Sequence, residues 1–240
     1  MLKNISKEVI EELNSGQRES SNLMEVLAVD IKILLNNVLP AFNFPELPTS
    51  LGITKKYKFL ATKLLQQFDF QIFEIFKNHK SDTIRALACY ILGEQALSFE
   101  EKLVLVRPLA DDHNSGVREW AWIALREDCT TVIEHAIALL VPWTASASSN
   151  IRRFSSELTR PRGVWCKHIN TLRKKPWLGL PILLPLHADP LEYVQLSVGN
   201  WLNDAGKDHA KWVQALCMEW MHTSRTPHTA KICKRAMRNM

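Results

Sequence analysis

The chain has 240 residues, of which 46% are hydrophobic and only 8 are glycine, and its net charge is +5. This composition excludes a disordered or glycine-rich all-β protein, and the length allows one large domain or two small ones. The charge is unevenly divided: residues 1–150 hold 15 Lys and Arg against 19 Asp and Glu, whereas residues 151–240 hold 15 against 6. The second part, at +9 against −4, is therefore the expected polyanion-binding part.

The cysteine and histidine pattern favours a reducing compartment and offers no metal site. The five cysteines are widely spread and include no CxxC pair, and no Cys/His cluster has metal-ligand spacing. The N-terminus lacks the apolar core of a signal peptide, and the most apolar later run, residues 177–186, is too short and proline-rich to cross a bilayer. We expect a cytoplasmic monomer with no metal, cofactor or membrane partner.

The first 80 residues predict helices separated by a proline-containing connector over 41–52. The second helix begins at Ser21 or Asn22, where Glu25 supplies a capping partner, and it ends before Pro40. The two helices after the connector form an expected antiparallel pair. The predicted ranges are 6–14, 21–39, 53–67 and 69–79.

From residue 81 a helical unit recurs. Equivalent β-branched residues are separated by 33, 34 and 43 positions, and they are Ile84, Val117, Ile151 and Val194. Capping residues precede each unit, namely Ser81 and Asp82, then Asn114, then Ser148 and Ser149, then Asp189 with Pro190. Companion helices are predicted over 98–110, 131–143, 176–186 and 209–222, and a last helix, which Thr226 caps, over 226–240.

Helix pairs that recur every 33 to 43 residues predict an α-solenoid of HEAT type, although chance periodicity in a helical bundle is the alternative. The predicted fold class is all-α, a right-handed superhelical solenoid of HEAT-like helical repeats. We expect a single domain over 1–240, with more acidic N-terminal helices over 1–80 and repeats with a basic groove over 81–240.

The third interval is longer because a basic loop, residues 161–175, lies inside it. The 24 residues from Arg152 hold eight Lys or Arg and a single acid, Glu157. One interpretation is a helix-surface pair with Arg153, worth about 0.3–0.5 kcal/mol. The other is that a carboxylate in a phosphate-binding groove stabilises positive charge, as when a cationic base leaves its sugar.

Successive repeats of such a solenoid line one concave surface. Matching positions place Glu119, Arg153, Glu157 and Asp204 in one predicted groove. Each acid also has a simpler explanation: Glu119 lies beside Arg118 on a possible solvated face, and Asp204 could cap the turn towards Gly206. Trp165 either stacks on a base, at about 1–3 kcal/mol, or packs in the core.

Three segments together carry a resemblance: RRFSSELTRPRGVW (152–165), VREWA (117–121) and SVGNWLNDAGK (197–207). They look like the AlkC branch of the AlkC/AlkD family of HEAT-like-repeat DNA glycosylases, over about residues 20–240. The resemblance implies a metal-free monofunctional DNA glycosylase that excises cationic alkylated bases such as 3-methyladenine from double-stranded DNA. It implies a nucleoid association when the protein is bound to DNA.

The resemblance also implies roles for individual residues. Glu119 and Glu157 would be the catalytic carboxylates, and Asp204 would assist them. Arg153 would hold the DNA backbone or orient Glu157, and Trp165 would contact the lesion. The remaining expected DNA-binding residues are Arg152, Arg160, Arg162, Lys167 and Lys175.

The sequence departs from the family pattern at two positions. Leu158 stands where the family usually has glycine, and Val164 where it commonly has proline, which puts the range of lesions in question. The alternative function is a non-catalytic HEAT-repeat module that binds DNA structures or a protein partner.

Overall fold

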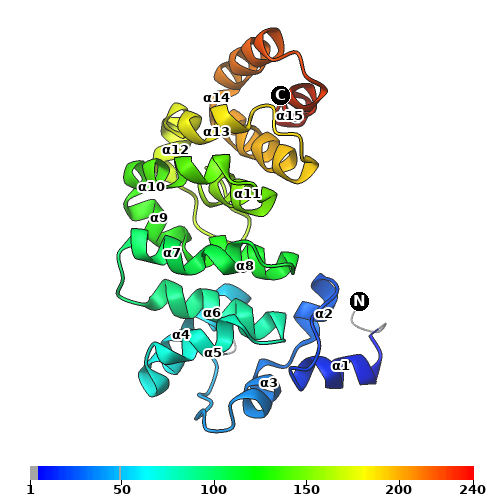
Figure 1. Cartoon of the computed structure of the whole chain (residues 1–240), viewed down its shortest axis with the longest axis vertical. Coiled ribbons are helices and arrows are strands. Elements are labelled where there is room, and N and C mark those ends of the chain that lie inside the picture. The colour runs from blue at the N-terminus through cyan, green and yellow to red at the C-terminus, as the bar shows by residue number, and fades with distance from the viewer. Residues whose placement is uncertain (1–4, 49) are drawn as a thin grey trace. The chain divides into compact units, whose positions relative to one another are not determined.

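The computed structural model describes residues 5–48 and 50–240. Those residues form helices joined by short connections and contain no strand, which confirms the predicted all-α class (Figure 1). None of the helices in this part of the chain is both long enough and apolar enough to cross a membrane. The chain divides into two compact units, residues 1–97 with 112–124, and residues 98–111 with 125–240. The single domain remains a prediction.

The first unit contains the predicted N-terminal helices and the first repeats. Its buried side chains include Leu60, Phe73 and Leu87, which are fully enclosed. Tyr57, Tyr90 and Trp120 join three of its helices through ring contacts at 5.3–6.0 Å. The helices are α1 (Lys7–Asn14), α2 (Leu23–Ala28), α3 (Ile31–Val38), α4 (Ile53–Phe68), α5 (Gln71–Lys77), α6 (Asp82–Glu94) and α8 (Ser115–Ala124).

The helix predicted over 21–39 is two helices, α2 and α3. The start was predicted correctly, because Asn22 is the N-cap and Glu25 accepts a hydrogen bond from the Ser21 amide at 2.9 Å. Asp30, however, accepts hydrogen bonds from the amides of Lys32 and Ile33 and so begins a new helix. Local capping therefore outweighs the continuous apolar pattern.

The second unit contains the remaining repeats and the basic segment. The 3₁₀ helix η2 overlaps the end of the companion helix predicted over 131–143 and extends beyond it, and η3 lies inside the one predicted over 176–186. Helix α14 packs closely against α15 (Figure 1). Its elements are α7 (Phe99–Ala110), α9 (Arg126–Thr131), α10 (Ile133–Leu140), η2 (Val141–Ala145), α11 (Ser149–Leu158), α12 (Asn170–Lys174), η3 (Pro176–Gly179), α13 (Leu180–Leu186), α14 (Glu192–Thr223) and α15 (Pro227–Ala236).

One predicted boundary in this unit is present as a kink, and another is wrong. The helices expected on either side of residue 208 lie within the single element α14, but they meet at a kink at His209, whose non-helical φ and ψ are −138° and 53°, so the break is present where it was predicted. The His209 ring donates to the Arg173 carbonyl of α12 at 2.9 Å, a contact between elements that no local pattern encodes. The last helix ends at Ala236 rather than at Met240.

Most predicted caps are present. Ser98 and Glu101 form a full capping box, and the side chains of Asn114, Ser148, Asp189 and Thr226 accept hydrogen bonds from amides at the starts of their helices. Ser81 is the exception, since its side chain makes no capping bond.

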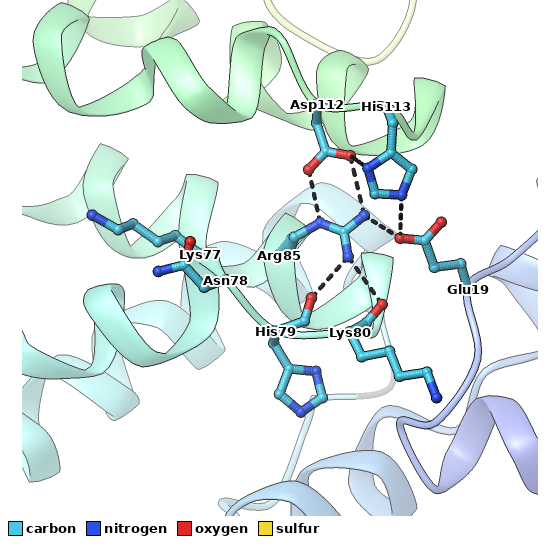
Figure 2. Close-up of a pocket in the computed structure, with 8 residues that line it drawn as sticks. All are labelled: Glu19, Lys77, Asn78, His79, Lys80, Arg85, Asp112 and His113. Atoms are coloured by element: carbon cyan, nitrogen blue, oxygen red, sulfur yellow. Dashed lines mark hydrogen bonds and ion pairs between the residues drawn. The ribbon is translucent and has the colours of Figure 1, made fainter.

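An arginine directly after the β-branched residue repeats the same contacts in three units. Arg85 donates from Nη1 to the carbonyls six and five residues earlier, His79 and Lys80, at 2.8 and 2.9 Å (Figure 2). Arg118 and Arg152 bond the two matching carbonyls at 2.6–3.0 Å. In the fourth repeat Gln195 Nε2 takes this place and donates to the Asp189 carbonyl at 2.8 Å. These bonds support the predicted repeat register.

Two of these arginines also bind a carboxylate of the following repeat. Arg85 Nε lies 2.7 Å from Asp112, and Arg152 Nε lies 2.6 Å from Asp189. Figure 2 shows that Glu19 and His113 complete the surroundings of the Arg85 guanidinium, around a polar cavity of about 540 Å³. Each arginine thus ties the loop before its own helix to the next repeat.

The close approach of η3 to Trp201 gives a stability test. A Cβ added at Gly179 would lie 2.4 Å from the fully buried Trp201 ring, so Gly179→Ala should lower the free energy of unfolding by about 1–3 kcal/mol. Denaturant unfolding measures this change. Gly52→Ala is the matched control, because no atom lies within 4 Å of its added Cβ. Equal stability of the two variants would contradict this packing.

Candidate functional site

Two buried carboxylates share one guanidinium in the second unit. Glu157 lies in the last turn of α11, and Asp204 lies within α14. Arg160, just after α11, donates from Nη1 to Glu157 at 3.0 Å and from Nη2 and Nε to Asp204 at 2.7 and 3.0 Å. Glu157 is 2% exposed and Asp204 5% exposed. The structure therefore brings these two predicted acids together and rules out the turn-capping explanation for Asp204.

A second arginine contacts Glu157 from the same helix. Arg153 Nη2 lies 3.4 Å from Glu157, so the predicted pair four residues apart is present. The Arg153 guanidinium also lies over the Tyr193 ring at 4.4 Å, a cation–π geometry that fixes its position. Because Glu157 is buried, the energy of an exposed helix pair does not apply to it.

The charges in this cluster depend on one another. Burial alone would lower the pKa of Arg160, but the charges of Glu157 and Asp204 outweigh burial and raise it. Lys207 Nζ adds a longer contact to Asp204 at 3.3 Å, with half of its side chain exposed. Arg160 therefore stays charged, and it compensates both acids.

The basic loop is closed at its base and carries apolar side chains at its tip. The Ile169 amide donates to the Pro161 carbonyl at 3.0 Å, which closes residues 161–169, the part of the loop that precedes α12. Val164 is 81% exposed and Trp165 40% exposed. This exposure shows that Trp165 is not a core residue.

Asp208, on α14, anchors the loop and the following helix. Arg162 donates to Asp208 at 2.8 Å and Arg173 at 3.0 Å. The hydrogen bond from Arg173, supported by Arg162, holds the pKa of Asp208 below its ordinary value. Arg162, predicted to bind DNA, thus already has a partner within the chain.

The other predicted DNA-binding residues differ in their surroundings. Arg152 has the repeat contacts that Arg85 and Arg118 share, so it has a structural role. The Lys167 side chain is 90% exposed and lies 3.5 Å from Glu127, and Lys175 is also exposed. Their contacts with DNA remain predictions.

Glu119 belongs to the first unit. It lies on α8, where it accepts a hydrogen bond from Trp122 Nε1 at 2.9 Å. Its sharing of one groove with Glu157 and Asp204 remains a prediction.

Arg126 is a residue of this region that the sequence did not reveal. It is 2% exposed at the start of α9, and its guanidinium donates to the carbonyls of Leu158 (2.6 Å), Arg160 and Lys167 (3.4 Å). Next to Glu127 and Asp128 it reads as an ordinary surface charge. One sequence feature sets it apart: Arg126 follows the β-branched residue Val117 by nine positions, as Arg160 follows Ile151.

Within the described ranges, no group of three or more His, Cys, Asp or Glu side chains is arranged to hold a metal ion. The carboxylates of the cluster are bonded to arginine and lysine instead. The arrangement can fix negative charge beside a basic loop.

Comparisons with known proteins identify the fold. No family model matches the sequence. Over 107 residues the chain is 39% identical to the uncharacterized protein YhaZ of Bacillus subtilis, a match that spans 45% of this chain and 29% of that protein.

Solved structures of similar fold include the following three. The alkylpurine DNA glycosylase AlkC of Pseudomonas fluorescens, bound to DNA containing an abasic site analog, has a TM-score of 0.67 and 21% identity over 99% of this chain and 64% of its own. AlkD2 of Streptococcus mutans has a TM-score of 0.66 and 20% identity, over 87% and 98%. The protein smu.31 of Streptococcus mutans has a TM-score of 0.65 and 21% identity, over 78% and 92%. The chain therefore shares their all-helical repeat fold.

The shared guanidinium predicts strong energetic coupling. Arg160→Met leaves two buried carboxylates without their main partner, so it should cost about 3–5 kcal/mol of unfolding free energy. Adding Glu157→Gln removes one of the stranded charges, and the double variant should be at least about 1 kcal/mol more stable than the sum of the single effects. Denaturant unfolding of the four proteins measures this coupling. Strict additivity would show that Arg160 does not hold Glu157.

Proposed function

We propose that the chain is a monofunctional DNA glycosylase that releases cationic alkylated bases, such as 3-methyladenine, from double-stranded DNA. The observation that carries the proposal is Glu157, a carboxylate buried at 2% exposure within the most basic segment of the chain and held by two arginines. The fold likeness to an alkylpurine DNA glycosylase bound to DNA supports it.

Release of a cationic base depends more on negative charge near the sugar than on a group that donates a proton to the base. A base alkylated on a ring nitrogen already carries positive charge, so its bond to C1′ breaks with the electron pair passing to the base, which leaves neutral. The sugar becomes oxocarbenium-like, and a nearby carboxylate stabilises it. The oxygen of a water molecule then bonds to C1′, and its proton passes to a carboxylate or to solvent.

In this proposal Glu157 supplies the negative potential beside C1′, and Asp204 or Glu119 orients the water. Arg160 supplies the positive charge that compensates the buried Glu157 and Asp204 carboxylates. Arg153 makes the longer of the two arginine contacts to Glu157, at 3.4 Å against 3.0 Å. A DNA phosphate competes with Glu157 for Arg153, which leaves more of the negative charge available.

The DNA-binding surface in this proposal is the basic loop. Exposed Lys167 and Lys175 contact phosphates, which releases counterions, and half-exposed Trp165 stacks against the DNA at the lesion. Arg162 reaches a phosphate only by sharing or leaving Asp208.

One observation favours a second candidate, a repeat module that binds DNA without chemistry. The oxygens of Glu157 and Asp204 are bonded to Arg153, Arg160 and Lys207, as in a purely structural ion cluster. This candidate predicts salt-dependent DNA binding without release of any base.

The test is base release from methylated duplex DNA, measured by chromatography under single-turnover conditions. Glu157→Gln should slow release of 3-methyladenine by about 100- to 1000-fold, because one electrostatic contact to the transition state is lost. Its affinity for DNA across a salt series should be unchanged or higher, since a repulsive charge is removed.

Glu192→Gln is the control, an exposed acid of α14 that pairs with Lys231, and it should release base at the wild-type rate. Release by Glu157→Gln at the wild-type rate would eliminate the catalytic role of Glu157. Binding without release by the wild-type protein would support the second candidate.

A further inference from the structure

Arg126 is buried, and among the described residues all the hydrogen-bond acceptors of its guanidinium are backbone carbonyls. Two of the acceptors, the carbonyls of Leu158 and Arg160, lie at the C-terminal end of α11. The third, the Lys167 carbonyl, lies within the basic loop. One side chain therefore bonds the backbone on both sides of residues 161–166, the first part of the basic loop.

The C-terminal end of α11 is a favourable position for a cation. The last carbonyls of a helix lack amide partners and carry the negative end of the helix dipole, so a guanidinium there satisfies them and is attracted to them. Trp201 Nε1 takes the remaining carbonyl in this stretch, that of Thr159, at 3.0 Å. The end of α11 is thus held by two buried donors from other elements.

The backbone that Arg126 contacts carries side chains of the proposed site. Glu157 precedes the Leu158 carbonyl directly, and the Arg160 carbonyl belongs to the residue that bridges Glu157 and Asp204. Trp165 lies between Arg160 and Lys167, inside the span that Arg126 closes. A shift of this backbone would move both the carboxylate cluster and the exposed tip of the loop.

We propose that Arg126 is a positioning residue that clamps the end of α11 to the basic loop and so fixes Arg160 against Glu157 and Trp165 against the DNA. The expected effect of Arg126 on base release rests on the proposed function. The expected effect on the backbone over 159–169 does not depend on that function. Lysine cannot replace this arginine fully, because an ammonium group lacks the planar fork that reaches three carbonyls.

The experiment compares Arg126→Met and Arg126→Lys with Lys102→Met. Lys102 is the matched control because it is also buried, at 3% exposure, and it pairs with Asp128 of α9, the helix that Arg126 begins. Hydrogen–deuterium exchange of the amides over 159–169 is measured without DNA, at a temperature where each protein is folded. Single-turnover release of 3-methyladenine is measured at saturating protein.

Arg126→Met should raise exchange over 159–169 at least about tenfold, with a comparable fall in the release rate, and Arg126→Lys should give intermediate values. Lys102→Met should leave exchange of this segment and the release rate near wild type. If Arg126→Met does not fold, Arg126→Lys carries the comparison, with a threefold rise in exchange as the threshold.

Unchanged exchange over 159–169 in a folded Arg126 variant would overturn the proposal, as would an equal rise in Lys102→Met. Failure of the wild-type protein to release base would instead overturn the proposed function and leave the exchange result standing. A slower release with unchanged exchange would also count against the clamp.

Discussion

The guanidinium of Arg160, shared by Glu157 and Asp204, is the interaction on which the rest of the candidate site depends. Two carboxylates of 2% and 5% exposure have lost most of their contact with water, and burying such groups costs free energy unless a cation and hydrogen bonds compensate them. Arg160 meets both with hydrogen bonds of 2.7–3.0 Å, and it joins the end of α11 to α14. The cluster thus keeps negative charge within a positively charged segment, an arrangement that stability alone does not require.

The buried and half-buried arginines of this fold have three different roles. Arg85, Arg118 and Arg152 tie their preceding loops to their helices in successive repeats. Arg126 and Arg160 act at the end of α11, one on backbone carbonyls and the other on carboxylates. The net charge of residues 151–240 therefore overstates the positive charge that the proposed DNA-binding surface offers, and the exposed lysines of the loop supply a larger share of that charge than the residue count suggests.

The sequence predicted the features that local chemistry determines. The capping box of Ser98 and Glu101 and the cap at Thr226 were correct, because these bonds form within one turn. The repeat register was also predictable, since β-branched residues recur at the same place in each unit. The pairing of Arg153 with Glu157 followed from their spacing on one helix.

What the sequence could not predict depends on contacts between elements. The helix break at His209 was predicted, but the hydrogen bond from its ring to the Arg173 carbonyl of another helix was not. The role of Arg126 depends on carbonyls more than thirty residues away, and the burial of Glu157 depends on the packing of α11 against α14. The Arg160 bridge to Asp204 crosses 44 positions of sequence, so no spacing rule indicates it.

The most direct test of the account is the affinity for DNA that carries a positively charged abasic-site analogue, such as a pyrrolidine in place of the sugar, against DNA with a neutral tetrahydrofuran. If Glu157 provides negative potential at C1′, the cationic analogue should bind at least about tenfold more tightly, and Glu157→Gln should remove that preference. Equal affinity of the wild-type protein for the two DNAs would contradict the claim that this cluster stabilises a forming cation.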